Sequence, residues 1–258
     1  MKKLMTATLV AITTGLMASA AFAEAVKVGV AAEPYPPFSS PDASGKWVGW
    51  EIEFMDAVCA EAKLECVLTP VAWDGIIPAL TESKIDAIMS SMSITEERMK
   101  TIDFSNKYYN TPAAIAVAKG SGIAATPEGL AGKIIGVQVS TIHADYAAKY
   151  FAPTAAEVKI YQTQDEANQD LAAGRVDAVL ADSLVMSDFT KTDAGKACCE
   201  IAGNVADDPA ILGKGVGVGM RKGDARLEAF NTAIAAVRAS GKYDEISKKY
   251  FDFDVYGK

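Results

Sequence analysis

Histidine is the scarcest reactive side chain in this sequence, whose 258 residues contain only His143. One histidine cannot supply the residue pairs of most zinc sites, and it leaves a single candidate base for a catalytic triad. The chain also lacks a G-x-S-x-G nucleophile motif and a glycine-rich phosphate loop that opens a helix. We therefore expect no metal ion and no cofactor, and we expect His143 at the surface or at a cleft edge rather than as a general base.

Long apolar runs are missing after residue 23, where no stretch reaches the roughly 18 residues of a membrane-spanning helix. Before that point, Lys2 and Lys3 precede a mostly apolar segment that ends in Ala21-Phe22-Ala23. This pattern is typical of a secretory signal peptide, cut here before Glu24. We therefore expect a mature protein that is exported across the inner membrane and is not inserted in it.

Basic residues are also fewer than acidic ones. Without Lys2 and Lys3, 23 of the 25 basic residues remain against 33 acidic ones, a formal charge of −10. Such a balance argues against nucleic acid and against an anionic membrane surface as partners.

Cysteine occurs four times, and four thiols in an exported chain suggest disulfides with three possible pairings. Cys59 and Cys66 would close a short loop, and this is the pairing that we favour. Cys198 and Cys199 are adjacent, and a ring between neighbours is strained. A reduced pair and a vicinal disulfide both stay open for them.

Strand and helix patterns alternate along the chain, which is typical of α/β architecture with parallel strands. The predicted strands are 26–30, 65–68, 85–89, 114–118, 134–139, 158–161, 176–180 and 213–219. The predicted helices are 52–61, 74–82, a short one from Thr126-Pro127, 142–150, 165–173, 225–240 and 243–250. No low-complexity linker separates domains. Boundaries are therefore expected within crossing strands, near Thr111 and within residues 213–217.

Two segments of the chain are similar to each other. Residues 73–91 (WDGIIPALTESKIDAIMSS) align without a gap on residues 164–182 (QDEANQDLAAGRVDAVLAD). Both are patterned as a helix followed by a short strand, which indicates an internal repeat. We therefore expect two similar lobes, in which Ser91 of one corresponds to Asp182 of the other.

A cluster of hydroxyl groups, Ser90-Ser91-Met92-Ser93-Ile94-Thr95-Glu96-Glu97-Arg98, follows the predicted strand 85–89. Thr95 can cap a helical turn whose free N–H groups attract an anion, and the Arg98 guanidinium can bind a carboxylate through two hydrogen bonds. The alternative interpretation of these residues is a Ser/Thr-rich turn whose arginine is solvated. Because α/β sheets bind ligands beyond the carboxyl ends of their strands, two facing lobes would present Arg98 and Asp182 to one cleft. Opposite charges placed this way suit a free α-amino acid.

With these features the chain resembles the periplasmic solute-binding proteins of polar amino acid ABC importers, family 3 of the bacterial extracellular solute-binding proteins. The resemblance is closest to the histidine-binding and lysine/arginine/ornithine-binding members and covers nearly all of residues 24–258. It rests on Tyr35-Pro36-Pro37-Phe38, Val48-Gly49-Trp50-Glu51-Ile52, the segment from Ile85 to Thr95, Gly174-Arg175-Val176-Asp177-Ala178 and the tail from Lys249 to Gly257. It implies a type II periplasmic binding protein fold of two α/β lobes joined by two crossing strands. Lobe 1 would comprise 24–111 and 217–258, and lobe 2 would comprise 112–216.

The resemblance also implies a ligand site. Arg98, Ser93 and the backbone around Thr141 would hold an α-carboxylate, whereas Asp182 and Ser91 would hold an α-ammonium. The full implied set is Glu33, Tyr35, Trp73, Ser90, Ser91, Met92, Ser93, Arg98, Thr141 and Asp182, with Tyr35 and Trp73 on either side of the ligand side chain. The family also carries a disulfide at the positions of Cys59 and Cys66.

This sequence departs from the family pattern in two places. Ser140-Thr141-Ile142 stands where relatives commonly have Gly-Thr-Thr, and one extra residue precedes the Tyr35 motif. The second departure bears on the alignment of Glu33.

Glu33 indicates the ligand class, because relatives that bind basic side chains resemble this chain in placing an acid just before the aromatic residue. We expect arginine, ornithine, lysine or histidine, with arginine favoured because its flat head stacks on aromatic faces. The resemblance implies a monomer in the periplasm, with an inner-membrane ABC permease as partner. The alternatives are an exported cyclohexadienyl dehydratase-like enzyme, with Glu33 or Glu51 as proton donor, and a ligand-binding module for a receptor.

Overall fold

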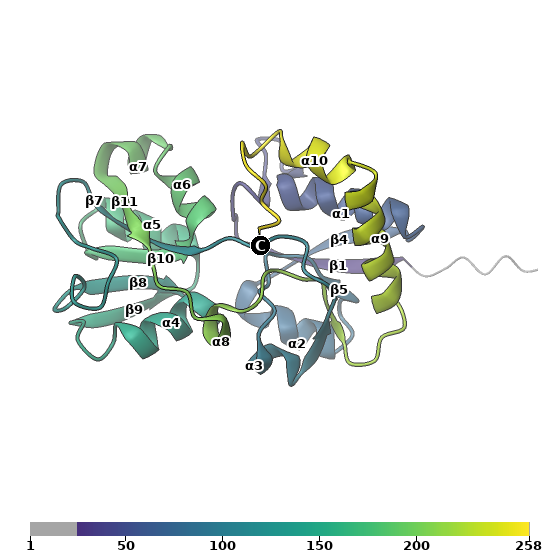
Figure 1. Cartoon of the computed structure of the whole chain (residues 1–258), viewed down its shortest axis with the longest axis horizontal. Coiled ribbons are helices and arrows are strands. Elements are labelled where there is room, and N and C mark those ends of the chain that lie inside the picture. The colour runs from purple at the N-terminus through teal and green to yellow at the C-terminus, as the bar shows by residue number, and fades with distance from the viewer. Residues whose placement is uncertain (1–24, 258) are drawn as a thin grey trace, which may run out of the picture.

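The computed structural model describes residues 25–257, so the expected signal peptide lies outside the described residues. Figure 1 shows two lobes side by side, joined by two crossing segments, of which one runs past the C-terminus and the other below it in this view. Each lobe is built on a five-stranded sheet. The chain is therefore a mixed α/β protein with the two-lobe, type II fold that the sequence predicts.

The two sheets have the same strand order and the same strand directions. In lobe 1 the order is β4 (Cys66–Val71), β1 (Val26–Ala31), β5 (Ala87–Ile88), β12 (Gly219–Arg221) and β6 (Ile102–Phe104). In lobe 2 the order is β9 (Glu157–Tyr161), β8 (Ile134–Gln138), β10 (Ala178–Asp182), β7 (Ala113–Ala118) and β11 (Cys199–Asn204). In each sheet the first three strands are parallel, whereas the last two pair antiparallel. The predicted repeat is confirmed, because β5 and β10 both occupy the middle of their sheets.

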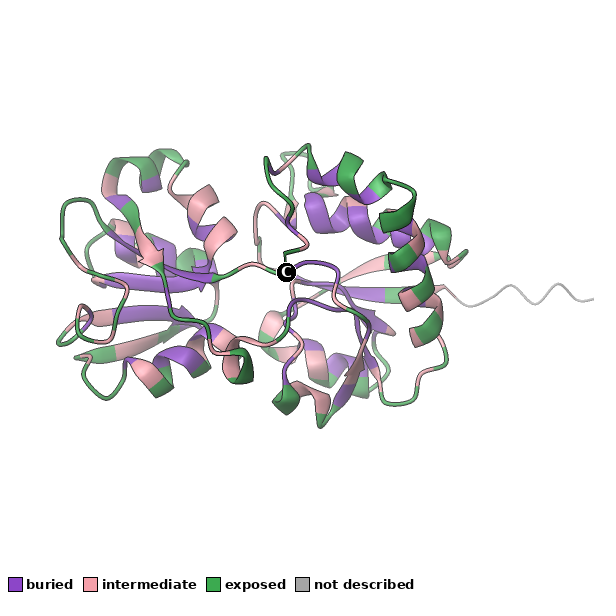
Figure 2. Ribbon diagram, in the orientation of Figure 1, coloured by how far each residue is buried: buried purple, intermediate pink, exposed green. Residues whose placement is uncertain are grey.

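Helices cover both faces of each sheet, and the inner strands β1, β5, β7, β8 and β10 are mostly buried (Figure 2). In lobe 1, α1 (Trp50–Glu61), α9 (Leu227–Ala239) and α10 (Lys242–Ser247) pack together on one face, and α2 (Ile76–Thr81) follows η1 (Trp73–Gly75) on the other. In lobe 2, α4 (Ile142–Tyr150) and α5 (Gln164–Ala172) cover opposite faces. The minor elements are β2 (Ser40–Pro41), β3 (Trp47–Val48), α3 (Glu96–Met99), α6 (Ser183–Phe189), α7 (Asp193–Cys198) and α8 (Pro209–Leu212). Apolar side chains buried in this way supply the main stabilisation of both lobes.

Two predicted elements differ from the structure, and several short elements were not predicted. Residues 127–132 form turns, capped by the Thr126 hydroxyl, in place of a short helix. Residues 213–218 do not form the predicted strand, and β12 begins only at Gly219, because Gly213 and Gly215 take φ angles of +84° and +95° that interrupt an extended chain. The short elements α6, α7 and β11 were not predicted, since their apolar patterns are too brief to show a period.

Both cysteine pairs form disulfides. Cys59 and Cys66 are bonded, with Cα atoms 6.1 Å apart, which confirms the favoured pairing. Cys198 and Cys199 form the vicinal disulfide that the sequence left open. No helix within residues 25–257 has the length and apolar character to span a bilayer.

The first crossing segment changes its hydrogen-bond partner from one lobe to the other within one residue. The Asn110 N–H donates to the Val255 carbonyl of lobe 1 at 3.0 Å. The next hydroxyl, that of Thr111, donates to Asp182 at the end of β10 in lobe 2. We therefore propose the first boundary between the lobes at Thr111, in agreement with the sequence.

The return crossing changes partner around Gly213. Before it, the Asp208 carboxylate accepts a hydrogen bond of 2.8 Å from the Tyr150 hydroxyl of α4. After it, the Lys214 N–H donates to the Ile94 carbonyl of lobe 1 at 3.0 Å. A Cβ atom on Gly213 would lie 2.6 Å from that carbonyl oxygen, so only glycine fits. We propose the second boundary at Gly213, inside the predicted interval.

Candidate ligand-binding site

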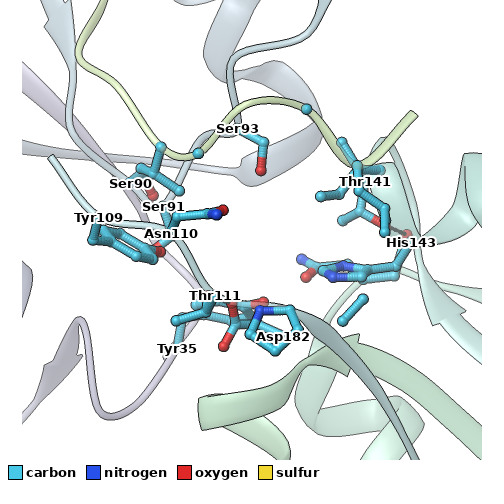
Figure 3. Close-up of a pocket in the computed structure, with 18 of the residues that line it drawn as sticks. Tyr35, Ser90, Ser91, Ser93, Tyr109, Asn110, Thr111, Thr141, His143 and Asp182 are labelled. Atoms are coloured by element: carbon cyan, nitrogen blue, oxygen red, sulfur yellow. Dashed lines mark hydrogen bonds between the residues drawn. The ribbon is translucent and has the colours of Figure 1, made fainter. Parts of the chain in front are cut away.

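A cavity of about 350 Å³ lies between the lobes, at the carboxyl ends of β1, β5, β8 and β10. This is where ligands bind in open α/β sheets. Figure 3 shows Ser90, Ser91, Ser93 and Tyr109 on one side of it and Thr141 and His143 on the other. Nine of the ten predicted site residues line the cavity: Glu33, Tyr35, Trp73, Ser90, Ser91, Ser93, Arg98, Thr141 and Asp182.

Met92 is the predicted residue that the structure places elsewhere. Its side chain is 1% exposed and packs in the hydrophobic core of lobe 1 with Ile88 and Ile102. The Met92 backbone carbonyl also accepts the Gly217 N–H at 3.2 Å. The methionine therefore supports the serine loop from behind.

Arg98 supplies positive charge from lobe 1. It lies in the short helix α3, whose first residue follows the capping hydroxyl of Thr95. Its guanidinium donates to the Ser93 carbonyl at 3.0 Å and, across the cleft, to the Ser140 carbonyl at 3.2 Å. It also lies over the Trp73 ring, 5.6 Å from the centroid. Burial lowers the pKa of Arg98 to about 10, and it remains a cation at neutral pH.

Asp182 supplies negative charge from lobe 2. It ends β10 and caps α6, because its carboxylate accepts the Leu184 N–H at 2.8 Å and the Thr111 hydroxyl. The side chain is buried without a cationic partner, and this burial raises the pKa of Asp182 to about 6. Both residues line the same cavity, and no cation among residues 25–257 acts on Asp182. The Asp145 carboxylate of α4 acts on Arg98 and opposes part of the effect of burial on its pKa. The cavity therefore holds two opposite charges that come from different lobes.

The serine loop after β5 is held by neighbours on both sides. The Ser90 hydroxyl accepts the Ala31 N–H at 2.8 Å, which ties the loop to β1. Ser91 has a φ of +52°, and its N–H and hydroxyl donate to Glu51 at 2.8 and 3.0 Å. The side chain of Ser93 lies at the opposite edge of the cavity from Asp182 (Figure 3). The loop thus presents hydroxyl groups along one wall.

Glu33, Tyr35 and Trp73 form the lobe 1 side of the mouth. The Glu33 carboxylate accepts the Trp73 N–H at 3.1 Å, so it also caps the start of η1. Burial and the nearby charge of Asp182 raise the pKa of Tyr35 well above its usual value. The indole Nε1 of Trp73 is buried without a hydrogen-bond partner.

Lobe 2 contributes the start of α4. The Thr141 hydroxyl accepts the Ala144 N–H at 3.1 Å and donates to the Gln138 carbonyl at 2.7 Å, which fixes the helix N-terminus at the cavity. His143 follows within the first turn and is 8% exposed. Burial, together with the charge of Arg98, lowers the pKa of His143 to about 3, so its imidazole is neutral. The helix N-terminus adds partial positive charge next to Arg98.

Several cavity residues were not predicted as ligand contacts, among them Tyr109, Asn110, Thr111, Gln138, His143 and Asp207. Tyr109, Asn110 and Thr111 lie on the first crossing segment, which the sequence did identify as a boundary. Asp207 lies on the return segment. Both segments pass the cleft because they connect the two lobes. Their predicted position at the lobe boundary could therefore have indicated that their residues line the cavity. Within residues 25–257 no three His, Cys, Asp or Glu side chains lie together in a way that could hold a metal ion.

Comparison with known proteins gives consistent results. The family model described as bacterial extracellular solute-binding proteins, family 3, matches residues 26–253. The chain is 46% identical over 234 residues to an L-arginine-binding protein of Pseudomonas aeruginosa, covering 90% of each chain. It is 41% identical over 251 residues to the lysine/arginine/ornithine-binding periplasmic protein of Escherichia coli, covering 96% of each. An ancestral arginine-binding protein bound to arginine superposes with a TM-score of 0.80 at 35% identity, covering 88% of this chain and 98% of that one.

Proposed function

Since the chain belongs to the bacterial extracellular solute-binding proteins, family 3, we propose that it binds a basic L-amino acid between its lobes and delivers it to an ABC importer. We further propose that it acts in the periplasm as a monomer. Arginine is the first candidate, followed by ornithine, lysine and histidine. The relatives named above are binding proteins, and their names supply this order of candidates.

The observation that carries the proposal is the pair of opposite charges in one cavity, Arg98 from lobe 1 and Asp182 from lobe 2. A free α-amino acid bears a carboxylate and an ammonium on one carbon atom and can match both. Its side chain then extends toward Glu33, Tyr35 and Trp73, where an acid and two aromatic faces suit a guanidinium or ammonium head. The cavity of about 350 Å³ is at the small end of ligand sites, as a single amino acid requires.

Closure of the lobes follows from the same geometry. A ligand that contacts Arg98 and Asp182 at once binds the closed arrangement better than the open one, and it shifts the population toward closure. Pivots at Thr111 and Gly213 would allow this motion with little change inside either lobe.

The enzyme alternative has less support in this cavity. Of the two acids considered as proton donors, Glu51 is 0% exposed and does not line the cavity. Glu33 does line it, but Glu33 accepts the Trp73 N–H as well.

Calorimetry and thermal shift on purified residues 24–258, with each standard amino acid and with ornithine, test the proposal. At a concentration 100-fold above its Kd, a ligand stabilises the folded state by about 2.7 kcal/mol, which a melting curve detects. We expect the basic L-amino acids to bind and the acidic ones not to. If none of these compounds raised the melting temperature, the proposed function would be wrong.

A further inference from the structure

Glu51 is a buried acid that the proposed ligand contacts do not use. It is the second residue of α1 and has no exposed surface. No ion pair of the described residues includes it, and its carboxylate instead accepts three hydrogen bonds. The donors are the Ser91 N–H at 2.8 Å, the Ser91 hydroxyl at 3.0 Å and the Tyr108 hydroxyl. A buried carboxylate is costly unless it is well hydrogen-bonded, so this arrangement needs a reason.

The three hydrogen bonds converge on the loop that lines the cavity. Ser91 has a φ of +52°, a left-handed conformation that costs a non-glycine residue free energy. Two of the three bonds are made by Ser91 itself, through its backbone and its side chain. Glu51 therefore holds Ser91 in a strained conformation, and it does so from the side away from the cavity.

The direction of these bonds decides what Ser91 offers to a ligand. A serine hydroxyl has one proton and two lone pairs. Because the Ser91 hydroxyl donates its proton to Glu51, it can act toward other groups only as an acceptor, through its lone pairs. Ser91 lines the cavity, so these lone pairs can accept a hydrogen bond from a group inside it.

The charge of Glu51 reaches the cavity as well. It acts on the phenols of Tyr35 and Tyr109, both of which line the cavity, and contributes to the raised pKa of each. An acid just beneath the wall thus adds to the attraction that Asp182 exerts on a cation from the other lobe.

We infer that Glu51 is a positioning residue for the ligand's α-ammonium group. It orients the Ser91 hydroxyl as a hydrogen-bond acceptor and places a second negative charge behind it. The inference rests on the proposed function, because it assumes an α-amino acid in the cavity. It goes further in assigning recognition of the ammonium to a residue that never touches the ligand.

The test compares two ligands that differ only in the ammonium group, L-arginine and 5-guanidinopentanoate. Replacing the acid in Glu51→Gln keeps its size but removes the charge and lets the amide donate to Ser91. We expect the Kd for L-arginine to rise about 10- to 100-fold, the loss typical of one hydrogen bond to a charged group. We expect the Kd for 5-guanidinopentanoate to stay within about twofold of wild type. Equal losses for both ligands would show a general disturbance of the site and overturn the inference.

Glu53→Gln is the matched control. Glu53 lies on the same helix, and its carboxylate bonds Lys249 and the Tyr250 hydroxyl at the surface, away from the cavity. The same change of chemistry there should leave the affinity for both ligands unaltered. A selective loss of L-arginine affinity in Glu53→Gln would point to net charge rather than position, and it would also overturn the inference.

A double-mutant cycle with Ser91→Ala tests whether Glu51 acts through the serine. Ser91→Ala alone should weaken L-arginine and spare 5-guanidinopentanoate, which provides a test even if Glu51→Gln fails to fold. In the Ser91→Ala background, Glu51→Gln should cost at least about threefold less than in wild type, because the two residues share one interaction. If Glu51→Gln raised the Kd by the same factor in both backgrounds, Glu51 would not act through Ser91. A Ser91→Ala protein that binds both ligands normally would also refute the inference. If wild type bound no amino acid at all, the proposed function would fail instead.

Discussion

The pH dependence of ligand affinity should report the protonation of Asp182. Burial raises the pKa of Asp182 to about 6, and an incoming ammonium group favours the ionised form. If only the carboxylate binds the ammonium, about one protein molecule in ten is competent at pH 5, against nearly all at pH 7.5. We therefore expect the Kd for a basic amino acid to rise about tenfold over that interval.

Calorimetry in two buffers of different ionisation enthalpy measures the protons released on binding as well as the Kd. Near the pKa of Asp182, about half a proton should be released for each ligand bound. Asp182→Asn is the control, since its weaker affinity should not vary with pH in this range if Asp182 alone titrates. A residual slope in Asp182→Asn would assign the effect to another buried acid, of which Glu51 is the nearest candidate, because burial raises its pKa too. A flat wild-type profile would refute the reasoning.

Three further predictions concern other parts of the molecule. Arg98→Ala should weaken every α-amino acid by about 2 to 5 kcal/mol in calorimetry, because it leaves a buried carboxylate unpaired, while agmatine, which has no carboxylate, should lose little. Glu33→Gln should weaken arginine and lysine but not glutamine; equal losses for the two classes would remove Glu33 from specificity. The double variant Cys59→Ser/Cys66→Ser should lower the free energy of unfolding by about 2 to 3 kcal/mol in urea titrations without a change in Kd, since it frees a short loop remote from the cavity.

The stability of the ligand-free protein should also depend on the protonation of Asp182. It should fall as the pH rises, whereas ligand affinity should increase. The pKa of Asp182 is higher in the folded protein than in the unfolded chain, so the folded state holds more protons between about pH 4 and pH 6. The contribution of Asp182 to stability is therefore fully present below pH 4 and is lost as the pH rises through 6. Bound ligand should reduce this loss, because an ammonium group lowers the folded-state pKa. Urea titrations with and without ligand measure the difference.

Much of the fold follows from local sequence patterns, because both lobes repeat one helix-then-strand unit and the apolar strands are distinct. The cavity was predicted from the residues after β5 and at the end of β10, which meet because carboxyl ends of strands share one edge. The place of Met92 could not be predicted in this way. It follows Ser91, whose positive φ turns the loop, and the next side chain then points into the core.

The contact between Glu51 and Ser91 could not be predicted from the sequence either. Glu51 and Ser91 are 40 residues apart, and each belongs to a recognisable motif of its own. Only the fold of lobe 1, which places the start of α1 next to the loop after β5, brings them together. The burial of His143 could not be predicted either. A sequence pattern can place a histidine on a helix, but it does not show that its imidazole is buried near Arg98.

The two charged residues of the cavity show why a dipolar ligand is favoured over either ion alone. Arg98 has a lowered pKa and Asp182 a raised one, so the empty site disfavours both charges. A simple cation would relieve Asp182 but add repulsion at Arg98, and a simple anion would do the reverse. An α-amino acid relieves both at once, and each pKa unit restored corresponds to about 1.4 kcal/mol. Because the charges belong to different lobes, that gain is complete only when the lobes are closed, which couples recognition of the ligand to the shape that an importer would detect.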